Sequence, residues 1–514
     1  MTQNTQNQKK TMQKLPKGYQ NAAFVENKLR HESERKRIQA GEKRALELFH
    51  QMAKRVPAYK DFLHAHRIKP ADITTIHDFQ RLPLLNKTNY LRKYPMEMLC
   101  WDGSYGKGQW VISSTSGSLG EPFYFPREHD QDLQYAITAE LYLRNQFAID
   151  RKKTLYVVAF PMGAWIGGVF TYEALKIIAG NGYDISVITP GIHKQEVINA
   201  VKQLAGSFDQ VIIGAYAPFL KDILDDGAAQ GIDWPRHKMG FVFSAEAFTE
   251  KFRDYIIAMT QPDNPLLFSL NHYGTVDMGT MAHETPESIL IRRQLVDDGK
   301  LKLLFPESRR QPTFTQYDPE LFYFEEEGQN LICSAYSGIP LVRYDLKDYG
   351  GIMTRQQVHE TLRAGGFNPD DMLRDAGIAD KVWNLPFLYI YERNDFSVSY
   401  YAFTIYPDMV RRALQAEEFE KVLTGKFTMY VDYDASGRQR LNVHVEMKRS
   451  VEADSKLPTA VSRRIHTALT EESSEYRETA REVGNPVKPV VYCHPYESAE
   501  YFRPGVKQKW VRKT

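Results

Sequence analysis

The chain has 514 residues, of which 42% are hydrophobic and 25% charged, and its formal net charge is +2. This length predicts more than one domain with a large core, and the balanced charge excludes a bulk attraction to nucleic acid or anionic membranes. The three cysteines, Cys100, Cys333 and Cys493, lie far apart and form no C-x-x-C pair. The sequence therefore predicts neither a zinc knuckle nor a disulfide framework.

The first residues are polar, and no run of about 18 apolar residues occurs in the sequence. We therefore expect no secretory signal, no membrane span and a cytoplasmic location. Residues 1–20 are predicted to be a disordered tail. Residues 24–56 have helical periodicity and many Lys, Arg and Glu residues. A helix packed on its own domain is favoured there over a membrane-binding helix.

A loop rich in serine and glycine, S-S-T-S-G-S-L-G-E-P, runs from Ser113 to Pro122 and leads into the apolar segment Phe123–Phe125. Such a loop can turn backbone N–H groups and hydroxyls inward, which creates a donor surface for phosphate. It is not a Walker-type loop, because no Gly-Lys-Ser/Thr sequence ends it. By composition alone, a plain surface loop remains the alternative.

After a predicted helix at Asp130–Phe147, short apolar runs alternate with segments of helical periodicity. This alternation predicts a parallel sheet covered by helices. Because ligands of such sheets bind beyond the C-terminal strand ends, the loops after the strands are candidate sites. The predicted strands are Leu155–Phe160, Ile185–Ile188, Val211–Gly214, Phe241–Phe243 and Leu266–Leu270, and the predicted helices are Thr171–Ala179, Lys194–Leu204, Ala217–Ala229 and Thr249–Met259.

Four of these loops carry groups that could bind a ligand. The glycine-rich turn Phe160–Gly168 and the aromatic residue Tyr216 could line an apolar pocket, although adjacent glycines also permit close helix packing. Ser244–Glu246 and Asn271–Asp277 place small, aromatic and acidic residues at two further strand ends. Taken singly, each group is also explained as a helix cap or a turn residue.

Residues 322–349 are predicted to form antiparallel strands. Asp348 follows an apolar run, where it could accept two hydroxyls of a ribose or serve as a turn aspartate. The predicted strands are Phe322–Phe324, Leu331–Ala335 and Ile339–Asp348. A polar helical stretch at Thr354–Leu373 and a further apolar run at Leu385–Tyr391 follow them.

Composition changes beyond about residue 395. The alternating segments Phe427–Tyr433 and Leu441–Glu446 flank the turn A-S-G-R-Q, which predicts a hairpin. A helix at Thr459–Glu472 and a strand at Pro489–Cys493 complete a small α+β unit. Lys507 lies in the basic tail that follows, where a solvated side chain is the alternative to a functional one.

The order and spacing of these segments resemble those of adenylate-forming enzymes. More narrowly, they resemble the phenylacetate–CoA ligase-like branch, which includes CapK-like proteins of capsule biosynthesis clusters. The resemblance extends from about residue 46 to residue 511. The similar segments are V-P-A-Y and L-P-L-L-N-K near the N-terminus, Thr115–Pro122 for the phosphate loop, Ser244–Glu246 for the adenine-side loop, Tyr273–Asp277 for the Tyr-Gly-x-Thr-Glu motif, Arg343–Asp348 for the Arg-Tyr-x-x-x-Asp motif, Glu392–Asp395 for the hinge and Gly505–Lys507 for the catalytic-lysine segment.

The resemblance implies an α/β fold with a large adenylation domain, 21–394, whose mixed sheets are covered by helices. A small, mobile α+β lid domain, 395–514, would follow it. Lys507, Asp277 and Thr115 are the implied catalytic residues, and Asp277 is the implied Mg²⁺ ligand. The other implied residues are Ser114, Thr115, Ser116, Gly117, Ser118, Gly120, Ser244, Ala245, Glu246, Asn271, His272, Tyr273, Gly274, Thr275, Arg343 and Asp348 for the nucleotide, and Arg393 and Asp395 for the hinge, while the candidates for the acid pocket are Phe160, Trp165, Gly167 and Tyr216.

The chain departs from the family pattern at several of these positions. The shorter carboxylate of Asp277, in place of glutamate, could contact the metal directly or through water. Because Val506 separates Gly505 from Lys507, Lys509 is a rival for the catalytic role. The departures are Asp277 for Glu, Val276 for Thr, Glu392 for the hinge glycine, Lys347 for the Gly common in the branch, and Val506 between Gly505 and Lys507.

The implied activity is ATP-dependent conversion of a carboxylic acid, aryl or otherwise apolar, to an acyl-adenylate with release of pyrophosphate. The acyl group would then pass to a thiol, most simply CoA. Transfer to a carrier protein, an amine or a sugar is an alternative, and so is a degenerate, non-catalytic nucleotide-binding protein. ATP, Mg²⁺ and CoA are the expected cofactors. Zinc and nucleic acid are not expected, and a homodimer is left open.

Overall fold

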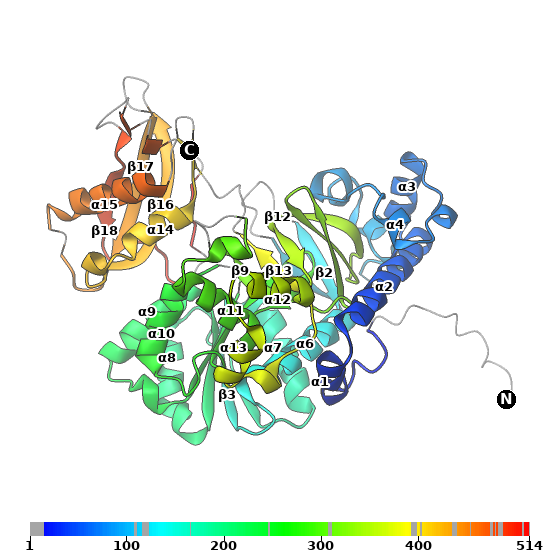
Figure 1. Ribbon diagram of the computed structural model, residues 1–514, viewed down its shortest axis with the longest axis horizontal. Coiled ribbons are helices and arrows are strands. Elements are labelled where there is room, and N and C mark those ends of the chain that lie inside the picture. Colours follow the sequence, from blue (N-terminus) through cyan, green and yellow to red (C-terminus); the bar gives the residue numbers. More distant parts are fainter. Residues whose placement is uncertain are drawn as a thin grey trace.

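The computed structural model divides into a large α/β body and a smaller unit formed by the C-terminal part of the chain (Figure 1). The residues that it describes are 15–106, 110–115, 123–164, 166–244, 247–306, 311–391, 398–400, 403–433, 439–452, 454–472, 476–477, 480–481, 487–505 and 508–512.

An eleven-stranded sheet organises the large body, with the strand order β10-β11-β12-β13-β9-β8-β7-β6-β5-β3-β4. The five strands at one end are mutually parallel, as the sequence predicts. They are β3 (Thr154–Ala159), β4 (Ile185–Ile188), β5 (Gln210–Ala215), β6 (Met239–Phe243) and β7 (Ser269–Thr275).

Helices cover both faces of this parallel half, because successive side chains of each strand point to opposite faces. Tyr156 and Val158 of β3 join a core shared with α6 and α7, whereas Leu155 and Val157 join a core shared with α8, α9 and α10. The covering helices are α6 (His129–Phe147), α7 (Ile166–Gly180), α8 (Lys194–Leu204), α9 (Ala217–Ala229) and α10 (Glu250–Thr260), all of which the sequence predicts.

The other six strands of the sheet are antiparallel to their neighbours. The predicted helical stretch 354–373 is instead two helices, because Gly366 has a left-handed φ of 88° that ends the first one. The strands are β8 (Gly279–His283), β9 (Thr313–Gln316), β10 (Phe322–Glu327), β11 (Asn330–Ala335), β12 (Leu341–Met353) and β13 (Phe387–Ile390), and the helices are α11 (Pro286–Asp297), α12 (Arg355–Ala364) and α13 (Pro369–Asp375).

At the N-terminal end, the predicted helix 24–56 is broken at Ser33, whose extended ψ of 140° separates α1 from α2. Residues 15–20 fall within the expected tail, and there Tyr19 is buried and donates a hydrogen bond to Asp318. The elements are α1 (Ala22–His31), α2 (Glu34–Arg55), α3 (Pro57–Ala65), α4 (Ile76–Phe79), α5 (Met96–Leu99) and the antiparallel pair β1 (Trp110–Ser114) and β2 (Tyr124–Glu128).

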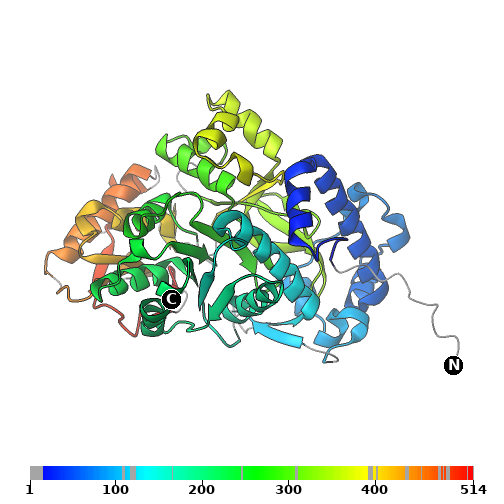
Figure 2. The same cartoon turned by 90° about the horizontal axis from the view of Figure 1, so that it is seen from below.

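The C-terminal unit, residues 398–512, has a hydrophobic core of its own. The predicted hairpin is present as β16 and β17, and β18 adds to it in parallel. Figure 2 shows this orange and red unit at the opposite end of the molecule from the blue N-terminal helices. Its elements are β14 (Val398–Tyr400), β15 (Phe403–Ile405), α14 (Pro407–Leu414), β16 (Leu423–Tyr433), β17 (Gln439–Met447), α15 (Leu457–Glu472) and β18 (Val490–His494).

Across the described part of the chain, no helix combines the length and the apolar character needed to cross a bilayer.

Candidate active site

The predicted phosphate loop connects β1 to β2, which form an antiparallel hairpin. At its base the Thr115 N–H donates to the Phe123 carbonyl over 3.0 Å, and the Thr115 hydroxyl oxygen accepts from the Phe123 N–H over 2.9 Å. Two hydrogen bonds therefore fix both ends of the loop. The hydroxyl of Thr115 keeps a proton that it can donate. Ser116, Gly117, Ser118 and Gly120 lie outside the described residues.

The loop after β3 lies against the base of this hairpin, because the Ser114 N–H donates to the Ala164 carbonyl over 2.9 Å. Phe160 in this loop is buried, and its ring meets Tyr216 edge-on with the centroids 5.6 Å apart. Two of the predicted pocket residues are thus in contact. A Cβ on Gly167 would make an ordinary 3.5 Å contact with Phe160. Trp165 lies outside the described residues.

Tyr273 and Asp348 bring together two motifs that are far apart in the sequence. The Tyr273 hydroxyl donates to Asp348 Oδ2 over 2.6 Å, across a separation of 75 residues. Tyr273 belongs to the end of β7, and Asp348 lies on β12. A residue predicted for the nucleotide and the predicted ribose ligand are therefore in direct contact, although β7 and β12 are not neighbouring strands of the sheet.

Asp277 follows β7 and is 7% exposed. Its Oδ2 accepts a hydrogen bond from the Tyr344 hydroxyl and lies 3.5 Å from the Lys87 ammonium. Lys87 is not among the residues selected from the sequence, although the structure places its ammonium beside Asp277. The sequence feature that could have indicated Lys87 is its position at the end of the family-like segment L-P-L-L-N-K. In the structure this segment pairs with β12 through the hydrogen bond from the Leu85 N–H to the Arg343 carbonyl.

The Arg343 side chain is directed at other parts of the protein. Its guanidinium contacts the Leu82 carbonyl and the carboxylate of Glu325, with the Nε–Oε1 distance at 3.1 Å. The residue has a left-handed φ of 47°, beside a register shift in the pairing of β11 with β12. In this arrangement Arg343 stabilises the strand that carries Asp348, and its role towards a nucleotide stays a prediction.

Asn271 and His272 are buried in the core beneath the strand end. Burial lowers the pKa of His272 well below its usual range, with a further contribution from His283, so the ring is neutral at pH 7. The His272 ring packs on Tyr142 with centroids 4.8 Å apart. These contacts stabilise β7 from within the core.

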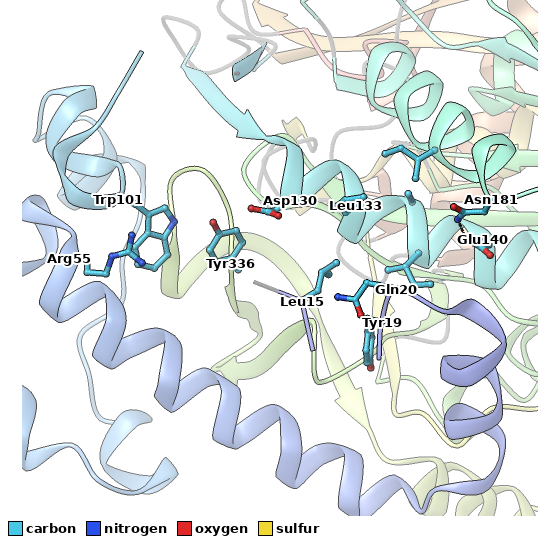
Figure 3. Close-up of a pocket in the computed structure, with 13 residues that line it drawn as sticks. Leu15, Tyr19, Gln20, Arg55, Trp101, Asp130, Leu133, Glu140, Asn181 and Tyr336 are labelled. Atoms are coloured by element: carbon cyan, nitrogen blue, oxygen red, sulfur yellow. Dashed lines mark hydrogen bonds between the residues drawn. The ribbon is translucent and has the colours of Figure 1, made fainter. Parts of the chain in front are cut away.

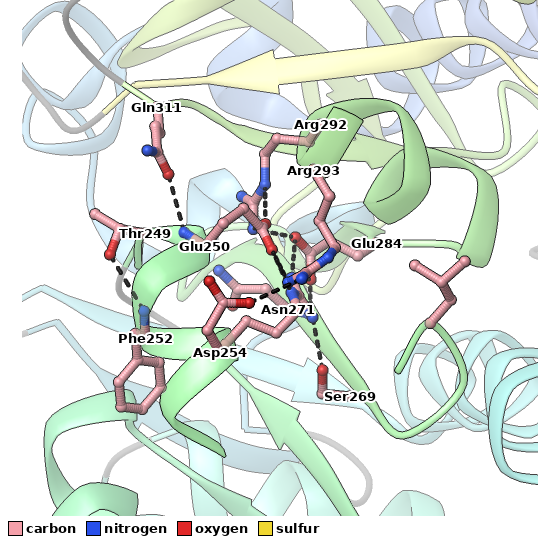
Figure 4. Close-up of polar contacts among 12 residues, drawn as sticks. Thr249, Glu250, Phe252, Asp254, Ser269, Asn271, Glu284, Arg292, Arg293 and Gln311 are labelled. Atoms are coloured by element: carbon pink, nitrogen blue, oxygen red, sulfur yellow. Dashed lines mark hydrogen bonds and ion pairs between the residues drawn. The ribbon is translucent and has the colours of Figure 1, made fainter. Parts of the chain in front are cut away.

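A buried network of arginines and glutamates fixes the same strand (Figure 4). Glu284 Oε2 accepts a hydrogen bond from the Asn271 N–H over 2.9 Å and pairs with Arg253 at 2.8 Å. Arg253 also pairs with Glu250, at 2.9 Å, at the start of α10. Since α10 follows the predicted adenine-side loop closely, the network links two predicted site loops.

The turn after β7 has little room for side chains. A Cβ on Gly274 would lie 2.7 Å from the Gly279 carbonyl oxygen, and the Thr275 hydroxyl accepts from the Met278 N–H over 3.2 Å. Ser244 directly follows β6 and is half-buried. Ala245 and Glu246 of the same loop, the hinge residues Glu392, Arg393 and Asp395, and Val506 and Lys507 lie outside the described residues.

Gly505 lies close to the end of one strand of the parallel half. It has a φ of 68°, and a Cβ there would lie 2.1 Å from Ile192 Cβ. Ile192 follows Gly191, whose N–H donates to the Val158 carbonyl of β3 over 3.1 Å. The segment that leads to Lys507 therefore approaches the end of β3. Lys509, its rival, is exposed.

No group of three or more His, Cys, Asp or Glu side chains among the described residues could hold a metal ion by itself. Mg²⁺ sites in proteins that bind phosphate compounds commonly use one or two carboxylates together with the substrate phosphates. Asp277 supplies one carboxylate at the expected place.

A cavity of about 620 Å³ lies elsewhere, between the N-terminal segment, α6 and α7 (Figure 3). Trp101 and Tyr336 stack at one side of it with centroids 5.6 Å apart. None of the described residues assigned to the nucleotide or the acid lines this cavity.

The sequence matches no protein-family model and no curated protein sequence. Solved structures do resemble it. The 2-hydroxyisobutyryl-CoA ligase in the postadenylation state aligns with a TM-score of 0.66 and 15% identity over 95% of this chain and 92% of the ligase. The same ligase in the thioesterification state gives a TM-score of 0.53 and 14% identity over 91% and 88%.

The GH3.15 acyl acid amido synthetase aligns with a TM-score of 0.57 and 14% identity over 94% of this chain and 90% of that one. The chain therefore has the fold of adenylate-forming enzymes, as the sequence predicts.

Proposed function

We propose that this protein uses ATP to convert a carboxylic acid to an acyl-adenylate, with release of pyrophosphate. The observation that carries the proposal is the hydrogen bond between Tyr273 and Asp348, because it brings a residue of the Tyr-Gly-x-Thr-Glu-like motif into contact with the proposed ribose ligand. Its support comes from an adenylate-forming fold in which the predicted phosphate loop joins a hairpin tied to the loop after β3.

In the proposed reaction the carboxylate attacks the α-phosphate, and charge grows on the phosphoryl oxygens. Preorganised donors and cations therefore supply most of the catalysis. The Thr115 hydroxyl and the backbone of the following loop would hold the phosphates, and Asp348 would accept the ribose hydroxyls. Lys87 is a cation beside Asp277, 3.5 Å from its carboxylate, and would add to the charge that stabilises the phosphates.

Mg²⁺, held by Asp277, would neutralise phosphate charge when bound. Lys507 would bridge the acid and the α-phosphate, and the hinge at Arg393 and Asp395 would let the C-terminal unit move between half-reactions. We assign the acid to the region of Phe160, Trp165, Gly167 and Tyr216. The edge-on contact of Phe160 with Tyr216 supports an apolar or aryl acid.

A thiol, most simply CoA, is our first choice of acceptor. An amine is the second candidate, because the amido synthetase has the same fold over 94% of this chain. A carrier protein and a sugar remain alternatives for the assay. Incubating acid, ATP and Mg²⁺ with CoA, with amino acids or with holo carrier protein, and identifying the product by mass spectrometry, separates them.

ATP–pyrophosphate exchange with a panel of aryl and aliphatic acids tests the first step. We expect exchange with at least one acid, loss of exchange in Lys507→Ala, and ATP binding that changes less than about threefold in that variant. Lys509→Ala is the matched control and should retain exchange. A protein that neither exchanges pyrophosphate with any acid nor binds ATP by calorimetry would be the degenerate alternative.

A further inference from the structure

Two acidic residues on one helix connect the large body to the C-terminal unit. Asp222 of α9 is 2% exposed and forms an ion pair with Lys426 of β16, which is 7% exposed. Lys426 also lies 3.4 Å from Glu446 of β17, which is fully buried. Figure 1 shows the C-terminal sheet beside α9 and α10 at this contact.

One turn further along α9, Asp226 forms a second set of contacts. Its Oδ2 lies 2.7 Å from the Lys194 ammonium and 3.2 Å from the Arg449 guanidinium. Lys194 in turn contacts Tyr496 at 2.7 Å and pairs with Glu497 of the C-terminal unit. We call these residues the α9 ion-pair cluster: Lys194, Asp222, Asp226, Lys426, Glu446, Arg449, Tyr496 and Glu497.

The ion pairs of the cluster depend on how the C-terminal unit is placed on α9. Taking charged groups out of water is costly, and their mutual attraction offsets this cost only while the partners stay in contact. If the C-terminal unit shifted along α9 while still covering it, Asp222 would stay buried but lose Lys426 as its partner. The buried pair between Asp222 and Lys426 therefore favours this one arrangement of the two parts over neighbouring ones.

This arrangement also brings Gly505 of the C-terminal unit close to the candidate site. Gly505 lies against Ile192, in the loop that contacts the end of β3, and it precedes Lys507 by two positions. The chain superposes better on the postadenylation structure of the 2-hydroxyisobutyryl-CoA ligase than on its thioesterification structure. The docked position therefore resembles the postadenylation arrangement of that ligase more than its thioesterification arrangement.

We propose that Asp222 and Lys426 are positioning residues that hold the C-terminal unit against α9 and thereby keep Gly505, which precedes Lys507 by two positions in the sequence, against Ile192 during adenylation. This role rests on the proposed adenylation. It predicts that breaking the pair slows adenylation without weakening ATP binding, because the ATP-binding residues of the large body remain in place.

The test compares Asp222→Asn with Asp225→Asn. Asp225 lies on the same helix, but its ion pair and hydrogen bond are with Lys221 and Tyr255 of the large body. We expect Asp222→Asn to lower kcat of pyrophosphate exchange about tenfold, with KM for ATP within about threefold, and Asp225→Asn to stay near wild type. Lys194→Met, at the more exposed part of the cluster, should have a smaller effect in the same direction.

A distance measurement tests the docking independently of activity. Spin labels on Gln203→Cys of α8 and Arg463→Cys of α15, both exposed, would report the separation in a Cys493→Ser background. Wild type should give one narrow distance distribution, and Asp222→Asn a broader or longer one in a protein whose circular dichroism is unchanged. An unchanged distribution in Asp222→Asn would overturn the proposal.

The two hypotheses fail differently. If wild type exchanges no pyrophosphate with any acid, the proposed function fails, while the distance distributions still support or overturn the docking role of Asp222. If exchange is normal in Asp222→Asn and in Lys194→Met, the positioning role fails and adenylation stands.

Discussion

The Tyr273 hydroxyl donates a 2.6 Å hydrogen bond to the carboxylate of Asp348, which joins β7 to β12 across the candidate site. A bond to a charged acceptor is stronger than one between neutral groups, so it holds the carboxylate in one orientation. The two residues should therefore act together in ATP binding.

Replacing Asp348 by Asn tests this pair. We expect the Kd for ATP to rise about tenfold, or about 1.4 kcal/mol, because the variant loses the charge that accepts the ribose hydroxyls. Tyr273→Phe should cost less, since it removes only the hydroxyl that orients the carboxylate. Titration calorimetry with ATP measures both, and equal Kd values for Asp348→Asn and wild type would rule out the ribose assignment.

Replacing Lys87 by Met tests the cation beside Asp277. Removing one preorganised charge from a phosphoryl-transfer site should lower kcat of pyrophosphate exchange about a hundredfold. Lys93→Met is the matched control, because Lys93 is exposed on the same segment and its ammonium lies over the Tyr94 ring. If both variants exchange pyrophosphate at the wild-type rate, Lys87 has no part in the reaction.

Substitution by alanine should affect the stability of the protein differently at two glycines of α7. A Cβ on Gly168 would lie 2.5 Å from the Met162 sulfur and 2.6 Å from the Pro161 carbonyl oxygen, whereas a Cβ on Gly180 would have open space. Gly168→Ala should therefore lower the melting temperature and disturb the predicted acid pocket. Gly180→Ala should leave the melting temperature unchanged or raise it slightly. The corresponding gain in the free energy of unfolding is at most about 1 kcal/mol. Differential scanning calorimetry on the two variants compares them directly.

His283 makes the fold sensitive to mild acid. Burial lowers the pKa of His283 from 6.5 to about 4, so the neutral form of the ring is favoured over the protonated form in the folded state. The corresponding stabilisation is complete above pH 6.5 and is lost as the pH falls towards 4, by an amount on the order of 3 kcal/mol. His283→Gln should have a flatter dependence of the free energy of unfolding on pH between 7 and 5.

Urea titrations at several pH values measure this dependence for wild type, His283→Gln and His64→Gln. His64 is exposed on α3 and serves as the control. The prediction fails if His283→Gln keeps the wild-type slope.

The sequence alone determined the elements of the parallel half and the small C-terminal sheet. Runs such as Val211–Gly214 and the turn between β16 and β17 are local signals, because hydrophobic periodicity and turn residues act over a few positions. Hydrophobic periodicity did not separate neighbouring helices: the expected helix 354–373 is two helices separated at Gly366. Strand limits also moved, since β7 begins at Ser269 rather than Leu266.

Only the tertiary structure decided which of these segments meet. Lys87 reaches Asp277, and Asp222 reaches Lys426, through pairings between segments far apart in the sequence. The direction of the Arg343 side chain, towards Glu325, depends on a left-handed backbone within β12. No local pattern contains such contacts, because they arise from the register of strands and the docking of helices. The sequence thus determined which residues could perform the chemistry, and the fold decided which of them stand together.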